Sequence, residues 1–301
     1  NFRELLEARW AEGKFVCVGL DSEYKKIPEP CRQTFGVAET ILVFNKAIVE
    51  ATHDVVCAFK PNVAFYEAYG DAGWLALRET VVYIRKVAPE VPVILDAKRA
   101  DIGNTNNGYV QNIFGFLDVD AVTVNPYLGA EALVPFLDQK DKGIIVLCRT
   151  SNPGAGEFQS LDISGDVVPG GYMPLYKYVA HRVSREWNKN GNCGLVVGAT
   201  VPDELREVRE LIGDMPILIP GIGAQGGDLE ATVQAGKDSR GRGMIINSSR
   251  GIIFASPGHD FALAARREAI KLHRAISQCL APPCATCGSV MVRMETIYKC
   301  L

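Results

Sequence analysis

The chain contains 301 residues, of which 48% are hydrophobic and 22% are charged, a composition typical of a soluble globular protein. The formal net charge is −3, from 32 Lys and Arg against 35 Asp and Glu, so no basic field favours nucleic acid as a partner. The longest apolar stretches, such as 144–148, are too short to cross a bilayer. The composition therefore predicts neither a nucleic-acid-binding protein nor a membrane protein.

Eight short runs of apolar and β-branched residues follow one another along the chain, separated by segments with helical periodicity. The predicted strands are 15–20, 55–60, 91–96, 121–125, 143–149, 194–198, 216–220 and 244–247, and the clearest predicted helices are 38–51, 74–87 and 202–212. Strands that alternate with helices indicate right-handed βαβ units and a parallel sheet. The pattern predicts an α/β protein with a single (β/α)8 TIM barrel over residues 1–280 and an active site at the carboxyl ends of its strands.

Two connections are longer than the others, 21–37 and 151–175. The second is an extended loop after strand five, on the expected catalytic face, and a helix over 175–188 follows it. A long connection in this place is often a lid over the active site, and a plain surface insertion is the alternative. The barrel pattern ends near Ala281, so 281–301 is interpreted as a tail of unknown role.

Nine cysteines in a chain of this length do not form a disulfide framework. Cys284 and Cys287 form a single C-x-x-C spacing in the tail, near Cys279 and Cys300, so a zinc knot is the alternative to a reduced tail. No signal peptide is recognisable, and we expect a reducing, cytoplasmic location. Three cysteines lie within predicted strands and are interpreted as small buried hydrophobes: Cys17, Cys57 and Cys148.

The third predicted strand ends in a dense group of charges. Asp96, Lys98 and Asp101 form a D-x-K-x-x-D pattern, and strand alternation places the first two on one face. The second strand ends in Lys60 in the same way. Such charges are costly to desolvate unless they pair, so we favour an alternating Lys/Asp network at the barrel mouth over an ordinary surface cluster. Asp21, after the first strand, is expected to join it.

Strands seven and eight end in sequences suited to an anion. The loop 220–227 is rich in glycine, so its backbone N–H groups can approach a phosphate closely, and barrels of this type commonly bind phosphate there. Residues 248–251 add hydroxyl groups and the guanidinium of Arg250. We therefore expect a phosphorylated small molecule, bound by these loops at one end and altered chemically at the other.

These motifs together resemble the orotidine 5′-phosphate decarboxylase family. The matching segments are 19–21, 59–62, 95–105, 149–154, 220–227 and 249–251, in order over roughly residues 5–275. The long connection after strand five resembles the longer-chain branch of the family. The resemblance implies the (β/α)8 barrel and the cofactor-free, metal-free conversion of orotidine 5′-phosphate into uridine 5′-phosphate in de novo pyrimidine biosynthesis.

The resemblance also implies roles for single residues. Lys98 stabilises and then protonates a carbanion at C6 of the pyrimidine, and Asp96 lies beside the departing carboxylate and positions Lys98. Asp101 and Thr105 reach into the active site of a partner subunit, so the protein is expected to be a homodimer with shared sites. The remaining binding residues implied are Asp21 and Lys60 for the ribose, Ser151 for the pyrimidine, and Pro220, Gln225, Ser249 and Arg250 for the phosphate.

Two alternative functions remain at this point. A sugar-phosphate decarboxylase or aldolase of the same superfamily shares the D-x-K-x-x-D pattern but binds Mg²⁺ through a carboxylate at the end of strand two, where this chain has Lys60. A non-catalytic nucleotide-binding barrel is the second alternative, although no charged member of the array is missing. The carboxylates around Lys98 favour its charged form and so argue against an imine-forming lysine.

Overall fold

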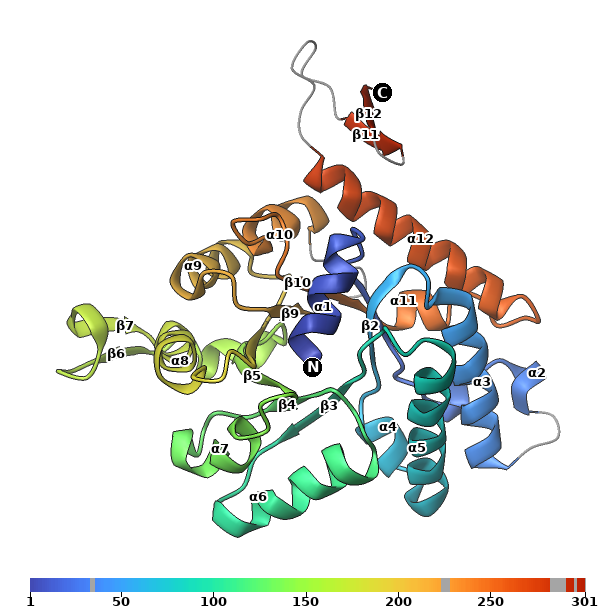
Figure 1. Ribbon diagram of the computed structural model, residues 1–301, viewed down its shortest axis with the longest axis horizontal. Helices are drawn as coiled ribbons and strands as arrows, with labels where there is room; N and C mark the ends of the chain where they lie inside the picture. The colour runs from blue at the N-terminus through green and yellow to red at the C-terminus, as the bar shows by residue number, and fades with distance from the viewer. Residues whose placement is uncertain (33–35, 223–227, 282–290, 295–296, 301) are drawn as a thin grey trace.

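Eight parallel strands form a ring in the computed structural model (Figure 1), which describes residues 1–32, 36–222, 228–281, 291–294 and 297–300. The strands are β1 (Val16–Gly19), β2 (Val56–Lys60), β3 (Ile94–Arg99), β4 (Ala121–Val124), β5 (Gly143–Arg149), β8 (Cys193–Val197), β9 (Ile217–Ile219) and β10 (Met244–Ser248). Their order is β2-β1-β10-β9-β8-β5-β4-β3. Single bridges from Phe59 to Val93 and from Asn62 to Asp96 join β2 to β3. The predicted barrel is confirmed, although β3 continues beyond its predicted end at Asp96.

Helices surround the ring, because each buries one apolar face against the strands. They are α1 (Phe2–Ala11), α2 (Glu29–Arg32), α3 (Val37–Thr52), α4 (Ala64–Glu67), α5 (Gly70–Val87), α6 (Gly103–Val110), α7 (Gly129–Leu137), α8 (Leu175–Arg182), α9 (Pro202–Ile212), α10 (Leu229–Gly236), α11 (Arg250–Ile253) and α12 (Phe261–Leu280). The predicted helices 38–51, 74–87 and 202–212 correspond to α3, α5 and α9. The predicted helix 175–188 is α8 followed by a π-helical turn, Val183–Trp187.

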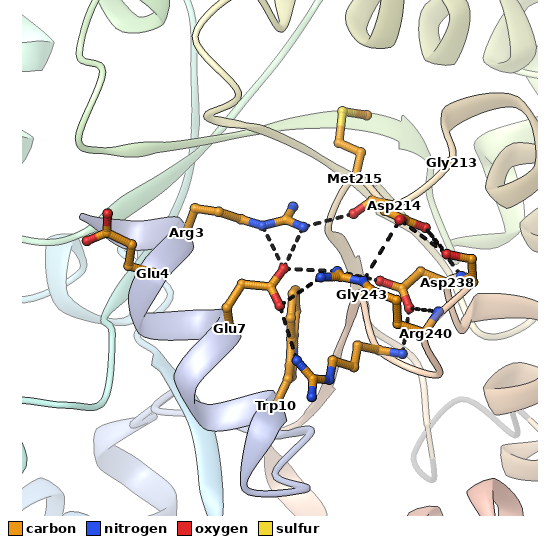
Figure 2. Close-up of polar contacts among 12 residues, drawn as sticks. Arg3, Glu4, Glu7, Trp10, Gly213, Asp214, Met215, Asp238, Arg240 and Gly243 are labelled. Carbon is orange, nitrogen blue, oxygen red and sulfur yellow. Dashed lines mark hydrogen bonds and ion pairs between the residues drawn. The ribbon is translucent and has the colours of Figure 1, made fainter.

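Helix α1 crosses the ring of strands and covers the end where the strands begin (Figure 1). Trp10 Nε1 donates to the Met244 carbonyl at the start of β10, at 2.8 Å. Glu7 accepts hydrogen bonds from Arg3 at 2.7 Å and from Arg240 at 3.0 Å (Figure 2). The opposite end, where the strands finish, is therefore the end available for a ligand.

The insertion after β5 extends sideways from the barrel. Its strands β6 (Asp162–Ser164) and β7 (Tyr172–Pro174) form an antiparallel hairpin that lies outside the ring of helices, next to α8 (Figure 1). The expectation of a lid therefore does not extend to this hairpin.

Beyond α12, β11 (Met291–Met294) and β12 (Ile297–Cys300) form a second hairpin, so the described part of the tail is structured. Cys284 and Cys287 lie outside the described residues. None of the described helices is both long and apolar enough to span a membrane.

Candidate active site

A buried carboxylate lies between two ammonium groups at the carboxyl ends of β2 and β3. Lys60 Nζ lies 2.9 Å from Asp96 Oδ2, and Lys98 Nζ lies 2.7 Å from Asp96 Oδ1. The side chains of Lys60 and Asp96 are 4% and 12% exposed, whereas that of Lys98 is 49% exposed. The structure thus brings these three residues together as the sequence predicts, and Lys98 is the one that a ligand in the barrel mouth can reach.

The charges of this site stabilise one another. Burial disfavours the charged form of Lys60, but the carboxylates of Asp96 and Asp21 outweigh it and hold the pKa of Lys60 above its usual value. Burial likewise opposes ionisation of Asp96, yet Lys60 and Lys98 hold the pKa of that carboxyl well below its usual range. Lys60 and Asp96 therefore both remain ionised near neutral pH. Burial raises the pKa of the nearby Cys17 thiol to about 12, so Cys17 stays neutral, as expected of a small buried hydrophobe.

Lys98 has a backbone conformation that is rare for a residue with a side chain. Its φ is +47°, in the left-handed region, which costs about 1–2 kcal/mol for an ordinary L residue. The strand does not alternate regularly here, because the register between β3 and β4 shifts between Leu95 and Arg99. Asp96 and Lys98 therefore meet because of a bulge in β3. The predicted pairing of the two residues is correct, but the reason given for it, regular alternation along a strand, is wrong. Thr123 of β4, which the sequence analysis did not single out, hydrogen-bonds Asp96 Oδ1 at 2.9 Å.

Asp21 lies directly after β1 and leaves one oxygen unused. Its Oδ1 is buried and accepts no hydrogen bond from the described residues. The chain beside it is fixed by a buried polar network: Ser22 Oγ donates to Asn45 Oδ1 at 2.5 Å, and Asn45 Nδ2 donates to the Tyr66 hydroxyl at 3.0 Å. The Tyr66 hydroxyl in turn donates to the Leu20 carbonyl at 2.9 Å. The backbone on both sides of Asp21 is therefore fixed, and its buried Oδ1 keeps an unused capacity to accept a hydrogen bond.

Asp101 does not belong to the charge network of its own chain. Its Oδ1 accepts the Ile102 N–H at 2.6 Å, and it forms no ion pair with a described lysine or arginine. Thr105 is exposed on α6, and the neighbouring Ile102 is 62% exposed. The structure thus places Thr105 on the exposed face of α6 and leaves the half-buried Asp101 apart from the three paired residues.

Ser151 lies where β5 ends, against the end of β8. A Cβ atom on Gly198 would lie 2.7 Å from Ser151 Cβ and 3.0 Å from Ser151 N, so only glycine fits at position 198. The preceding residue, Thr150, is held by the insertion, because its N–H donates to Gln159 Oε1 at 2.8 Å. The start of the insertion is therefore fastened to the barrel end at which the charges lie.

The predicted phosphate loops lie across the barrel from Lys98. β9 is four strands from β3 in either direction round the ring, and β10 is its neighbour. Ser249 packs against β1 so closely that a Cβ on Gly19 would lie 1.8 Å from Ser249 Oγ. Arg250 is exposed, and its side chain forms no hydrogen bond or ion pair with the described residues, so its guanidinium is available to an anion.

The other phosphate loop is described only in part. The Pro220 carbonyl accepts the Ala199 N–H at 2.8 Å, which ties the end of β9 to the end of β8. Gly221 has a φ of +102°, a conformation that favours glycine. Gln225 lies outside the described residues. Within the described ranges, no three His, Cys, Asp or Glu side chains are grouped so that they could hold a metal ion.

A parallel (β/α)8 barrel whose strand ends carry a Lys–Asp–Lys array, buried at Lys60 and exposed at Lys98, is typical of enzymes whose chemistry depends on fixed charges. The sequence matches the Orotidine 5'-phosphate decarboxylase / HUMPS family over residues 14–263, and the chain belongs to this family. It is 46% identical to orotidine 5'-phosphate decarboxylase of Cellvibrio japonicus, over 92% of this chain and 98% of the relative. The corresponding relative in Janthinobacterium sp. is 47% identical over 93% of this chain and 100% of its own length. The protein is thus placed among the carboxy-lyases of the family.

Solved structures show the same fold. The structure of OMP decarboxylase from Leishmania donovani is 39% identical, covers 91% of this chain and 98% of its own, and superposes with a TM-score of 0.76. The structure of a putative orotidine-monophosphate-decarboxylase from Toxoplasma gondii is 37% identical, covers 92% of this chain and 97% of its own, and has a TM-score of 0.78. The resemblance stated from the motifs is therefore confirmed at the level of the family and the fold.

Proposed function

We propose that this enzyme decarboxylates orotidine 5′-phosphate to uridine 5′-phosphate in de novo pyrimidine biosynthesis, by removing the carboxylate at C6 of a pyrimidine ring that is already complete. The observation that carries the proposal is the array Lys60–Asp96–Lys98, buried at one end and exposed at Lys98. The names of relatives 46–47% identical over almost their whole length support the same substrate.

The proposed chemistry uses charges that are already in place. Loss of CO2 from C6 leaves the electron pair of the broken C–C bond on that carbon, as a carbanion with little resonance stabilisation. The Lys98 ammonium, next to C6, stabilises this pair electrostatically and then donates a proton to it, which completes uridine 5′-phosphate. Asp96 keeps Lys98 in position through the 2.7 Å ion pair, and Lys60 anchors Asp96 from the other side. Preorganised charges of this kind are usually the largest single contribution to catalysis.

The rest of the substrate is assigned to the surrounding strand ends. Asp21, with its free buried oxygen, and Lys60 are suited to the ribose hydroxyls. Ser151, fixed against Gly198, is assigned to the pyrimidine. For the phosphate we propose the unpaired Arg250, with Ser249, Pro220 and Gln225.

The enzyme is proposed to act as a homodimer with shared sites, on the basis of Asp101 and Thr105. Asp101 has no ion pair with the described residues of its own chain, and Ile102 and Thr105 are exposed, which supports a role in a partner's site. Lys98→Ala and Asp101→Ala homodimers should each be nearly inactive. After subunit exchange, random pairing makes about half of the dimers mixed, each with one intact site, so about a quarter of sites should recover. If mass spectrometry shows exchange but no activity returns, Asp101 serves its own subunit.

The reaction is proposed to need no metal or cofactor, and this separates it from the Mg²⁺-dependent sugar-phosphate alternative. Lys60 occupies the place at the end of β2 where that chemistry needs a carboxylate, and an ammonium group cannot ligate Mg²⁺. Loss of orotate absorbance should proceed at full rate after exhaustive chelation. A strict requirement for Mg²⁺ would instead favour the sugar-phosphate reaction, and binding of nucleotide without turnover would favour the non-catalytic alternative.

We propose a cytoplasmic location, which fractionation of the source cells would test.

A further inference from the structure

Three residues of β3 lie opposite one residue of β4. In the register of the two strands, Leu95 faces Val122 and Arg99 faces Val124. Residues 96–98 of β3 therefore share Thr123 as their only counterpart on β4. An extra residue in one strand is a β-bulge, and two extra residues disturb the ladder further, because their N–H groups lose their regular partners. The two residues with charged side chains in this bulge are Asp96 and Lys98.

The Thr123 hydroxyl replaces the missing partners of the bulge. Its oxygen accepts the Ala97 N–H at 3.0 Å and the Lys98 N–H at 2.9 Å, and its proton is donated to Asp96 Oδ1 at 2.9 Å. One donor and two acceptor sites are all that a hydroxyl has, so the group is fully used. Thr123 is 1% exposed, so no water can take its place without a change in packing.

We propose that Thr123 is a positioning residue for the decarboxylation: its hydroxyl holds the bulge that turns Lys98 into the left-handed region and fixes the Asp96 carboxylate between the two lysines. This inference rests on the proposed function. Thr123 acts through Asp96 and Lys98, and it need not touch the substrate. The left-handed backbone of Lys98 persists because the surrounding structure holds it there.

The chemistry of the side chain makes two substitutions informative. Thr123→Val keeps the shape and the β-branch but removes the hydroxyl, so the Ala97 and Lys98 N–H groups lose their acceptor and Asp96 Oδ1 keeps only its ion pair with Lys98. Thr123→Ser keeps the hydroxyl and removes only a methyl group. Thr52→Val is the matched control, because Thr52 is also fully buried, in α3, and its hydroxyl donates to the Ile48 carbonyl at 2.7 Å.

The experiment measures kcat and KM for orotidine 5′-phosphate, the Kd of uridine 5′-phosphate, and amide hydrogen exchange of the peptide containing residues 95–99. Thr123→Val should lower kcat on the order of 10- to 100-fold, while KM and the product Kd change by less than about threefold. The same variant should speed exchange in the 95–99 peptide. Thr123→Ser should recover most of kcat, and Thr52→Val should match the wild type in kcat and in exchange of this peptide.

Two outcomes overturn the inference. Wild-type kcat in Thr123→Val would show that the hydroxyl does not position the array. A loss of kcat accompanied by an equal loss of product affinity, with no recovery in Thr123→Ser, would assign Thr123 to general packing. If the wild-type enzyme itself does not convert orotidine 5′-phosphate, the proposed function fails, whereas exchange of the 95–99 peptide still reports whether Thr123 holds the bulge.

Discussion

Asp96→Asn should destabilise the fold as well as abolish turnover, because it leaves a buried ammonium group without its nearest counter-ion. Lys60 is 4% exposed at its side chain and depends on Asp96 at 2.9 Å. Removing one partner of a buried ion pair typically costs about 3–5 kcal/mol. Asp21 also favours the charge on Lys60, so part of the compensation remains. We therefore expect a loss of about 2–4 kcal/mol in the free energy of unfolding. Lys98 contributes little to this value because it is half exposed.

Urea unfolding followed by circular dichroism measures this loss, with an exposed pair as the control. Asp54 and Arg266 are 47% and 38% exposed at their side chains, so Asp54→Asn should cost less than about 1 kcal/mol. Adding Lys60→Met to Asp96→Asn should restore stability, because it removes the unpaired charge. If the double variant is no more stable than Asp96→Asn, the buried ammonium is not the source of the loss and the reasoning is wrong.

The ion pair between Lys60 and Asp96 also makes the stability of the fold depend on pH. The pKa of Asp96 is lowered on folding, so its contribution is fully present above the unfolded value of about 3.9 and is lost as the pH falls towards the folded value. The pKa of Lys60 is raised, so its contribution is fully present below about 10.4 and is lost as the pH rises through the folded value. The difference in stability between wild type and Asp96→Asn should therefore be nearly constant from about pH 5 to pH 9 and should shrink in acid. A difference that grows as the pH falls below 4 would contradict this assignment.

Three further substitutions test other parts of the site. Arg250→Ala should lower kcat/KM for orotidine 5′-phosphate about 30- to 1,000-fold and that for orotidine much less, and equal losses would show that Arg250 does not hold the phosphate. Lys98→Ala should eliminate product formation while the circular dichroism spectrum stays native, because the side chain is 49% exposed; appreciable turnover would assign the proton donor elsewhere. Gly198→Ala should displace Ser151 and lower stability by about 1–3 kcal/mol in urea unfolding, whereas Gly115→Ala, with only an ordinary contact at 3.7 Å, should cost less than about 1 kcal/mol.

The barrel and the three central charges were predictable because they follow from local patterns. Each β-branched run is a strand, and the alternation of strands with helices determines which strand ends meet. Lys60 and Asp96 could be placed together because both lie towards the carboxyl ends of neighbouring parallel strands, although β3 continues to Arg99.

The bulge at Lys98 was not predictable from strand periodicity. Its cause is the pairing of β3 with β4, which the sequence of β3 alone does not contain. The signal that could have indicated it was Thr123, the single hydroxyl in the otherwise apolar run 121–124. Asn45 was missed for a similar reason, since its place in a helix gives no indication of the buried network that it joins with Ser22 and Tyr66.

The hydrogen bonds between Glu7 of α1 and Arg240, at the end of the barrel where the strands begin, have a consequence for how the chain folds. Glu7 and Arg240 are 233 positions apart, and β1 pairs with β10. Contacts of such long range form late, because the entropy of closing the intervening loop must be overcome first. During synthesis, α1 can bind early partners, since Arg9 donates to the Val56 carbonyl at the start of β2, but one edge of β1 remains unpaired until β10 has left the ribosome. A chain that stops before β10 therefore exposes an unpaired strand edge, and we expect such truncated chains to aggregate.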